Sequence, residues 1–442
     1  MRPLLIGLLL VSLLGAGCEQ LKELVGAQKS AEQRARMAIE QGEALLHAGK
    51  LDEAEAAFQE ALKLRPNHPG ALFGLASIYA ERGEDARALL ELGHVALLAP
   101  QHPGPPELMG DILMRQGKYE KAAARYEEAA ARRSEDTALR LKLAEAYLRA
   151  GKEKEAEAAI DAVLDADPTH SEALAMRGAL LAAQGNFEVA ERVLKDAAAH
   201  ATSPAPWSVL GSFLLKQGRP AEAVDALRRA LEKDPENPRF VRDLAEAMIE
   251  AGDAVAAADL LAPWTQKRPN DAAIHAAYAR ALIASGRAED ALAHAKTAVR
   301  LMPHLVDAWL AQGEALEGTG DLDGAVRAYR SAAKQAPEVT DVYRSLARVY
   351  EKLGNLPEAI ASSERVAQLD PSDRRARIHL AELYADSPID AGKGKRLVEE
   401  LLAEDPGDPK LLALKRRLEQ AAKRAPPRPK KRPTGPLIIK GR

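Results

Sequence analysis

Apolar residues along the chain recur at spacings of three and four, which is the pattern of helices with one buried face. In the segment 320–338, GDLDGAVRAYRSAAKQAPE, the residues Ala325, Tyr329 and Ala332 fall on one such face. The glycine that opens the segment ends the preceding helix, because glycine adopts the left-handed conformation that other residues resist. The proline near its end stops the next helix, because proline has no amide donor and disfavours helix in the residue before it. The segment therefore predicts a tight turn followed by one helix of defined length.

The same arrangement of a glycine, a helix and a closing proline repeats along most of the chain with a nearly constant period. Glycines recur at spacings of 34, with one spacing of 33, at Gly49, Gly83, Gly117, Gly151, Gly185, Gly218, Gly252, Gly286, Gly320 and Gly354. An alanine stands at a fixed position after each of them, a glycine or alanine at a fixed position before each, and a proline closes most of the units. Small residues at these positions let paired helices approach closely. Each unit is therefore predicted to be a helix hairpin whose apolar face only a neighbouring hairpin can cover.

This pattern resembles the tetratricopeptide repeat, which places large, small and proline residues at fixed offsets within each repeat. In the unit 306–339 the matching residues are Trp309, Gly313, Leu316, Ala325, Tyr329, Ala332 and Pro337. The resemblance implies an all-α fold, a right-handed superhelical solenoid of about 11 hairpins with a C-terminal capping helix. We expect ten units over 35–373, a degenerate eleventh unit over 374–407 that lacks the inter-helix glycine, and the capping helix over 408–424.

The start of the chain has the architecture of a signal peptide. A single positive charge precedes an apolar run, from Leu4 to Gly17, that contains no charged side chain. The stretch 14–18, LGAGC, resembles the lipobox of bacterial lipoproteins, which implies that Cys18, the only cysteine, is lipidated after residues 1–17 are removed. Residues 18–34 then form a tether and the start of the first helix. The alternative is an ordinary secretory signal with an incidental cysteine.

The C-terminal end is strongly basic. Residues 415–442 hold 11 Lys and Arg and one Glu, a net charge of +10, so residues 1–414 hold 51 basic and 64 acidic residues. The segment 425–442 is too rich in proline and charge to pack, and we expect it to be disordered. Its cluster of Arg428, Lys430, Lys431 and Arg432 could bind anionic lipid or glycan, or serve only solubility. Nucleic acid is disfavoured, because the tail has no aromatic residue on which bases could stack.

The sequence gives no sign of catalysis, of a metal site or of a cofactor. The ten histidines stand singly, none in the spacing that binds zinc, and one cysteine cannot build a thiolate site. The stretch 392–395, GKGK, is similar to a phosphate-binding loop, but it lacks the preceding glycine and the following Ser or Thr. We expect it to be a polar loop.

A protein-binding groove is the remaining candidate site. In the tetratricopeptide family the first helix of each hairpin lines a concave groove, and here its outward positions carry charges of both signs. The basic residues proposed for this groove are Arg239, Arg242, Arg344, Arg348 and Lys352. The last three, which stand one helical turn apart, could bind an acidic segment; a solvated helix face is the alternative.

Together these features predict a non-catalytic scaffold for protein–protein interactions, anchored in the outer membrane through acyl chains on Cys18 and facing the periplasm. The resemblance to envelope lipoproteins implies a role in assembling a secretion, polysaccharide-export or pilus machine. The alternative is a soluble periplasmic module, associated with glycan or peptidoglycan and tethered by its basic tail. The two differ in how binding depends on salt, because a tail-driven contact weakens as salt screens it.

Overall fold

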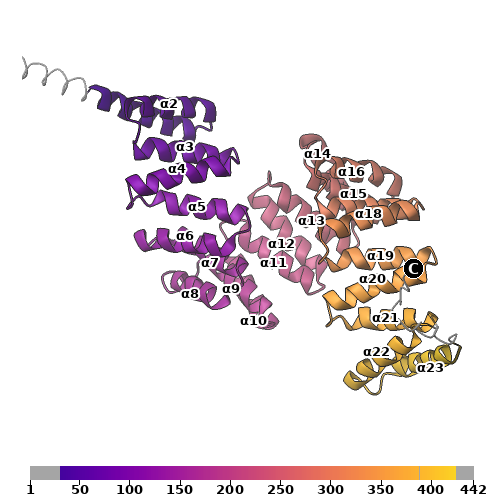
Figure 1. Cartoon of the computed structure of the whole chain (residues 1–442). Coiled ribbons are helices and arrows are strands. Elements are labelled where there is room, and N and C mark those ends of the chain that lie inside the picture. The colour runs from indigo at the N-terminus through magenta and orange to yellow at the C-terminus, as the bar shows by residue number, and fades with distance from the viewer. Residues whose placement is uncertain (1–29, 388, 425–442) are drawn as a thin grey trace, which may run out of the picture. The chain divides into compact units, whose positions relative to one another are not determined.

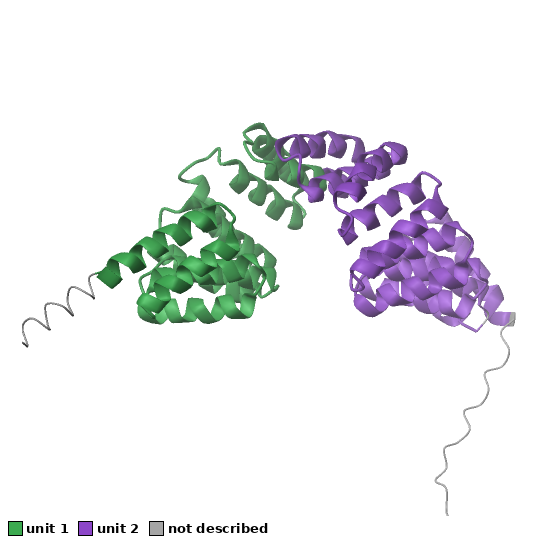
Figure 2. Cartoon of the chain, turned by 90° about the horizontal axis from the view of Figure 1, so that it is seen from above, with its two compact units in different colours: residues 1–213 green, residues 214–442 purple. Residues whose placement is uncertain are grey.

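The computed structural model describes residues 30–387 and 389–424, and these residues form helices joined by short turns, with no strand among them. The chain divides into two compact units, Met1–Phe213 and Leu214–Arg442 (Figure 2). Cys18 and the basic cluster at 428–432 lie outside the described residues. None of the described helices is both long enough and apolar enough to cross a membrane.

The first unit is a succession of antiparallel helices, each packed on its neighbour along the chain (Figure 1). It opens with helical residues 30–47. The helices that follow are α2 (Leu51–Leu64), α3 (Pro69–Glu81), α4 (Asp85–Leu98), α5 (Gly104–Arg115), α6 (Tyr119–Arg132), α7 (Thr137–Arg149), α8 (Glu153–Leu164), α9 (Ser171–Ala183) and α10 (Phe187–Ala199). The unit boundary falls within α11 (Ala205–Lys216).

The second unit repeats this arrangement. Its helices are α12 (Pro220–Lys233), α13 (Pro238–Glu250), α14 (Ala254–Lys267), α15 (Ala272–Ala284), α16 (Ala288–Leu301), α17 (Val306–Gly318), α18 (Leu322–Gln335), α19 (Thr340–Lys352), α20 (Leu356–Leu369), α21 (Arg374–Asp386), α22 (Ala391–Glu404) and α23 (Pro409–Arg424). The expected all-α fold of stacked hairpins is confirmed. Odd-numbered helices from α3 to α21 are the first helices of their hairpins.

The ten periodic glycines have the backbone conformation that the sequence predicts. Within the described part of the chain, positive φ angles occur at these ten glycines alone, with values between +69° and +91°. Around Gly286 no atom lies within 4 Å of the place where a Cβ would be built. The glycine is therefore required by the backbone conformation and not by lack of space.

Substituting Gly286 by alanine isolates this conformational cost. We expect Gly286→Ala to lower the free energy of unfolding by about 1 kcal/mol, because an L-residue is strained in the left-handed region. Gly286→Asn should lose less, because asparagine tolerates this region better. Urea unfolding followed by circular dichroism measures both variants, and an unchanged midpoint for the alanine variant would contradict the interpretation.

Small residues on the first helix of a hairpin face large residues on the second. A Cβ on Gly42, Gly110, Gly178 or Gly313 would lie within 3 Å of Phe58, Tyr126, Leu194 and Tyr329 respectively. Phe58, Leu194 and Tyr329 are fully buried. Each of these hairpin cores is thus a large side chain inserted against a glycine, as close helix packing requires.

The end of the second unit departs from this pattern and corrects one expectation. The GKGK stretch is not a loop: it lies in the first turns of α22, and Lys393 Nζ lies 2.8 Å from Glu364 Oε1. A Cβ on Gly394 would lie 2.5 Å from Leu418 Cδ2 of α23. Gly394 is therefore a packing position, and α23 covers α22 with buried Leu411, Leu414 and Leu418.

Candidate functional site

The first cavity in the second unit is formed by three first helices. α15 packs against both α13 and α17, and a cavity of about 230 Å³ opens between them. Its charged lining consists of Arg239, Arg242, Asp243, Glu246, Arg280 and Asp307. Two of the predicted groove residues therefore lie together on one surface, built only from first helices.

Charges in this cavity are incompletely paired. Arg280 Nη1 lies 3.3 Å from Glu246 Oε1, and Arg239 Nε lies 3.5 Å from Asp243 Oδ2. Burial raises the pKa of Asp243, although Arg239 and Arg242 oppose the shift. The guanidinium of Arg242 donates to the carbonyl of Pro238 at 3.3 Å and forms no ion pair with any described carboxylate. The surface can therefore still bind an anionic group from outside.

A second cavity of about 550 Å³ lies between α19, α20 and α21. Its polar lining consists of Arg344, Arg348, Glu351, Ser363, Asp373, Arg375 and His379, and its apolar wall of Ala347, Val366 and Ala376. Arg344 and Arg348 keep about half of their side chains exposed, 46% and 52%. The cavity is therefore reachable from solvent through residues of the first helices.

The basic stripe of α19 has partners inside the chain. Arg344 lies 2.7 Å from Asp373, whereas Arg348 and Lys352 both bind Glu317 of α17, at 3.1 and 2.8 Å. An acidic partner segment would have to compete with these carboxylates. The proposal that the stripe binds such a segment stays a prediction.

Glu317 is the centre of this network. Its side chain is only 7% exposed, and it also accepts a hydrogen bond from Tyr329 Oη at 3.0 Å. Burial by itself would raise the pKa of Glu317, but hydrogen bonds from Lys352 and Arg348 hold it below its usual value of 4.5. The carboxylate is thus ionised at neutral pH and ties α17, α18 and α19 together.

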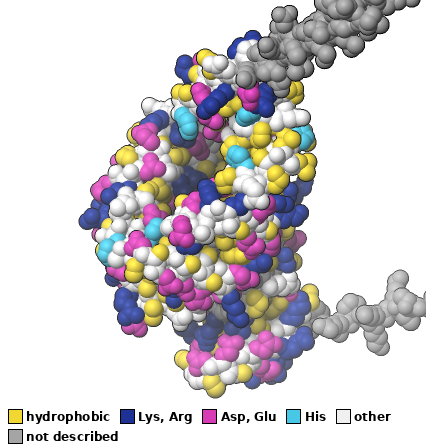
Figure 3. Space-filling view, turned by 90° about the vertical axis from the view of Figure 1, so that its left-hand side faces the viewer, with side chains coloured by type: hydrophobic (Ala, Val, Ile, Leu, Met, Phe, Trp, Pro, Cys, Tyr) yellow, Lys and Arg dark blue, Asp and Glu magenta, His cyan; other side chains and the backbone are white. Residues whose placement is uncertain are grey.

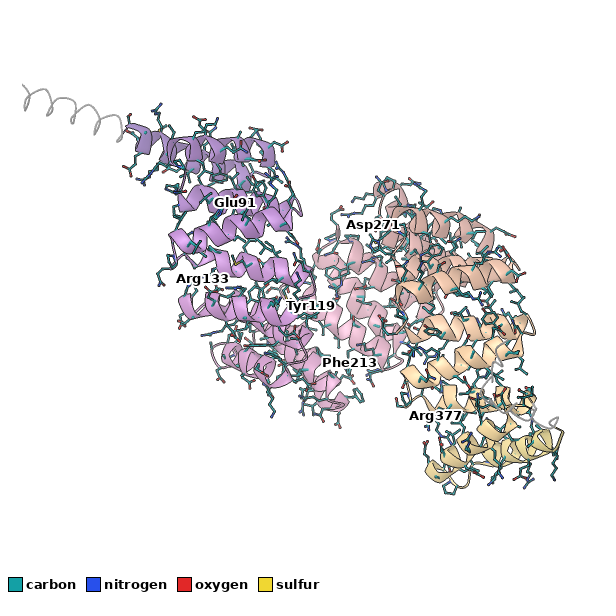
Figure 4. The ribbon with its side chains drawn as sticks, viewed as in Figure 1. Glu91, Tyr119, Arg133, Phe213, Asp271 and Arg377 are labelled. Carbon is teal, nitrogen blue, oxygen red and sulfur yellow. The ribbon has the colours of Figure 1, made fainter. Side chains whose placement is uncertain are left out.

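Ion pairs between neighbouring repeats recur elsewhere. In the first unit, Lys142 Nζ on α7 lies 2.8 Å from Glu107 and 3.0 Å from Asp111, both on α5. Within the last hairpin of the second unit, Arg377 of α21, labelled in Figure 4, also lies 2.8 Å from Glu404 of α22. On the face in Figure 3, basic and acidic side chains are interspersed. Many groove charges therefore also stabilise the stacking of repeats.

Two polar features were missed by sequence reasoning. His275 of α15 is 7% exposed, and its Nδ1 lies 3.0 Å from Nδ1 of His294 on α16. Ser363 of α20 is 3% exposed, and its Oγ has no hydrogen-bond partner among the described residues. A signal for Ser363 was present, because it stands at the position of the second helix where most other units carry a large side chain.

No group of described residues is placed to hold a metal ion.

Stacked helix hairpins with a surface lined by their first helices define an α-helical repeat protein, a class that presents extended surfaces. Family models described as tetratricopeptide repeat match residues 113–180 and 214–281, 21–104 and 276–340, 340–383, and 171–195. The chain belongs to the tetratricopeptide repeat family.

Two curated relatives are both described as cellulose synthase operon protein C. The one from Pseudomonas fluorescens (strain SBW25) is 27% identical over 237 residues, which cover 46% of this chain and 18% of that protein. The one from Xanthomonas axonopodis pv. citri (strain 306) is 28% identical over 235 residues, covering 47% and 15%. The match thus spans less than a fifth of either relative. Among solved structures, yeast Tom70 is 15% identical, with a TM-score of 0.48 over 89% of this chain and 96% of that one.

Proposed function

We propose that the chain is a non-catalytic scaffold that recruits a protein partner through the first helices of its second unit. The observation that carries this proposal is the cavity formed by α13, α15 and α17, which gathers Arg239 and Arg242 on one surface. Solenoids of this family bind other proteins or peptides, and their repeated first helices offer contacts along an extended path.

We further propose that the scaffold is held in the cell envelope by acyl chains on Cys18 and faces the periplasm from the outer membrane. The lipobox-like stretch before Cys18 supports this. Of the machines considered, the relatives described as cellulose synthase operon proteins favour polysaccharide export over secretion or pilus assembly. The basic tail at 428–432 would add an electrostatic contact with anionic lipid or glycan.

An affinity capture from envelope extracts tests the scaffold. We expect the wild-type chain to retain a defined envelope protein, and Arg239→Glu together with Arg242→Glu to reduce its recovery at least about tenfold through charge reversal. The matched control is Arg396→Glu, because Arg396 is an exposed arginine of α22 that lines neither cavity. Equal recovery by both variants would contradict the proposed groove.

The anchor has its own test. Mass spectrometry of the mature N-terminus should find a lipidated Cys18, and Cys18→Ser should move the protein from the membrane to the soluble fraction. An unmodified cysteine would contradict the anchor. Binding that survives in the groove variant but disappears with deletion of 425–442 or with salt would favour the soluble, tail-tethered alternative.

A further inference from the structure

The cavity between α19, α20 and α21 exists because one packing residue of the repeat is missing. In most other units the residue at this position of the second helix is large and fully buried, as with Phe58, Leu92, Ile160 and Tyr329. In the hairpin of α19 and α20 it is Ser363, which leaves the wall between Ala347 and Val366 unfilled. The cavity therefore occupies the space that a large side chain fills in most other units.

Ser363 also points to the chemistry of what fills this place. Its Oγ is buried and makes no hydrogen bond within the described chain, whereas the adjacent Ser362 donates to the carbonyl of Glu358 at 2.8 Å. A buried hydroxyl without a partner is costly, so a purely apolar occupant would leave that cost in place. The occupant should carry a polar atom at the end of an otherwise apolar side chain.

The fold itself shows that tyrosine fits this position of a hairpin. Tyr126 and Tyr329 occupy it in two other units, and their hydroxyls donate to first-helix carboxylates, Asp111 at 2.7 Å and Glu317 at 3.0 Å. The residue one repeat after Glu317 is Glu351, which lines the cavity. Glu351 and Ser363 both line the cavity, so its walls offer an incoming phenol a carboxylate and a hydroxyl as polar groups.

Charges at the cavity favour a partner in which acidic residues flank the tyrosine. The lining holds three arginines and two carboxylates, and both carboxylates are engaged: Asp373 with Arg344 at 2.7 Å, and Glu351 with His379 at 2.9 Å. The guanidinium of Arg375 has no ion-pair partner in the described ranges. An anion next to the bound side chain can pair with it.

We propose that this cavity binds the side chain of a tyrosine that lies in an acidic segment of a protein partner. The inference deepens the proposed scaffold function, since it rests on recruitment through first helices and specifies what the partner presents. It concerns a different cavity from that of Arg239 and Arg242, so the two can fail separately.

Capped model peptides test the chemistry directly. The probe is acetyl-Glu-Glu-Tyr-Glu-Glu-amide, compared with versions that carry Phe or Ala in place of Tyr, titrated into the full chain and followed by the methyl signals of Val366 and Ala347. We expect the Tyr peptide to bind about fivefold more tightly than the Phe peptide, a difference of about 1 kcal/mol from one hydrogen bond. The Ala peptide should bind at least about twentyfold more weakly. Equal affinity for all three peptides would overturn the proposal.

Variants of the chain assign the contacts. Ser363→Ala should remove the preference for Tyr over Phe, and Arg375→Ala should weaken all peptides and reduce their dependence on salt. Arg396→Ala is the matched control and should change nothing. Loss of binding in the control to the same degree as in Arg375→Ala would overturn the assignment.

Ser363→Leu is the decisive variant, because another unit of the fold already has leucine at the equivalent position. Ala76, Leu92 and Val95 occupy the same three positions in another unit, and all three are fully buried. Filling the cavity should raise the melting temperature by about 3 °C and abolish binding of the Tyr peptide. A stable variant that still binds this peptide would overturn the proposal.

The same variant separates this inference from the proposed function. If Ser363→Leu keeps the captured envelope protein as well as wild type does, the tyrosine site is wrong and the scaffold stands. If wild type captures no envelope protein, the scaffold is wrong, and the peptide titration alone decides the site.

Discussion

Replacing Gly313 by alanine should destabilise the second unit by about 3 kcal/mol, because the new methyl group overpacks a filled core. A Cβ at this position would lie 2.3 Å from Cε1 of Tyr329. The ring cannot withdraw easily, since Tyr329 is fully buried and its hydroxyl is bound to Glu317. Urea unfolding followed by circular dichroism measures the loss.

Gly392→Ala is the matched control for this substitution. Gly392 is also a helical glycine of the second unit, but no atom lies within 4 Å of its built Cβ. Alanine should therefore stabilise α22 by about 1 kcal/mol through helix propensity. Opposite signs for the two variants would establish that the small residue serves helix contact, and destabilisation of both by similar amounts would contradict this.

Glu317→Gln should lower the free energy of unfolding by about 2 kcal/mol at neutral pH, because two cations and a phenol lose a buried anionic acceptor. The folded pKa of Glu317 lies below 4.5, since hydrogen bonds from Lys352 and Arg348 outweigh burial. The stabilisation is therefore complete above the unfolded pKa and is lost as the pH falls through the lower folded value. Unfolding curves at pH 7 and in acid should show the difference between wild type and variant disappear.

Glu314 on the same helix provides the control with the opposite sign. Burial raises the pKa of Glu314, with Glu317 adding to the shift, so its ionisation works against folding. Glu314→Gln should therefore stabilise the chain at pH 7, and its advantage should fade as acid protonates the wild-type residue. Two variants with the same pH dependence would contradict the electrostatic interpretation of α17.

The regular part of the fold could be predicted from sequence, because each repeat fixes the backbone conformation of its turns and the side-chain volumes where its two helices meet. The ten periodic glycines fix the turns, and the pairing of Gly313 with Tyr329 fixes how two helices meet. At Gly394 a packing glycine stands between lysines, and this composition resembles a phosphate loop although the residue lies in α22 against Leu418.

The candidate site could be predicted only in part. The repeat pattern assigned the candidate arginines to outward positions of first helices but predicted no cavity. In the structure Arg239 and Arg242 line one cavity, and Arg344 and Arg348 line another. That these residues bind a partner stays a prediction. The repeat pattern could not show that Glu317 binds both Arg348 and Lys352, because partners in the neighbouring repeat depend on side-chain reach across the stack. The cavity above Ser363 arises from a side chain that is absent, and such a gap is visible only when every unit is compared with its neighbours.

Site-specific photo-crosslinking in the native host tests the scaffold most directly. A crosslinking residue at Arg239, in the groove, is compared with one at Val255 of α14, which is 64% exposed and lines neither cavity. We expect the groove position to capture one defined envelope protein and the α14 position to capture none. Equal capture from both positions, or capture from Val255 alone, would contradict recruitment through the first helices.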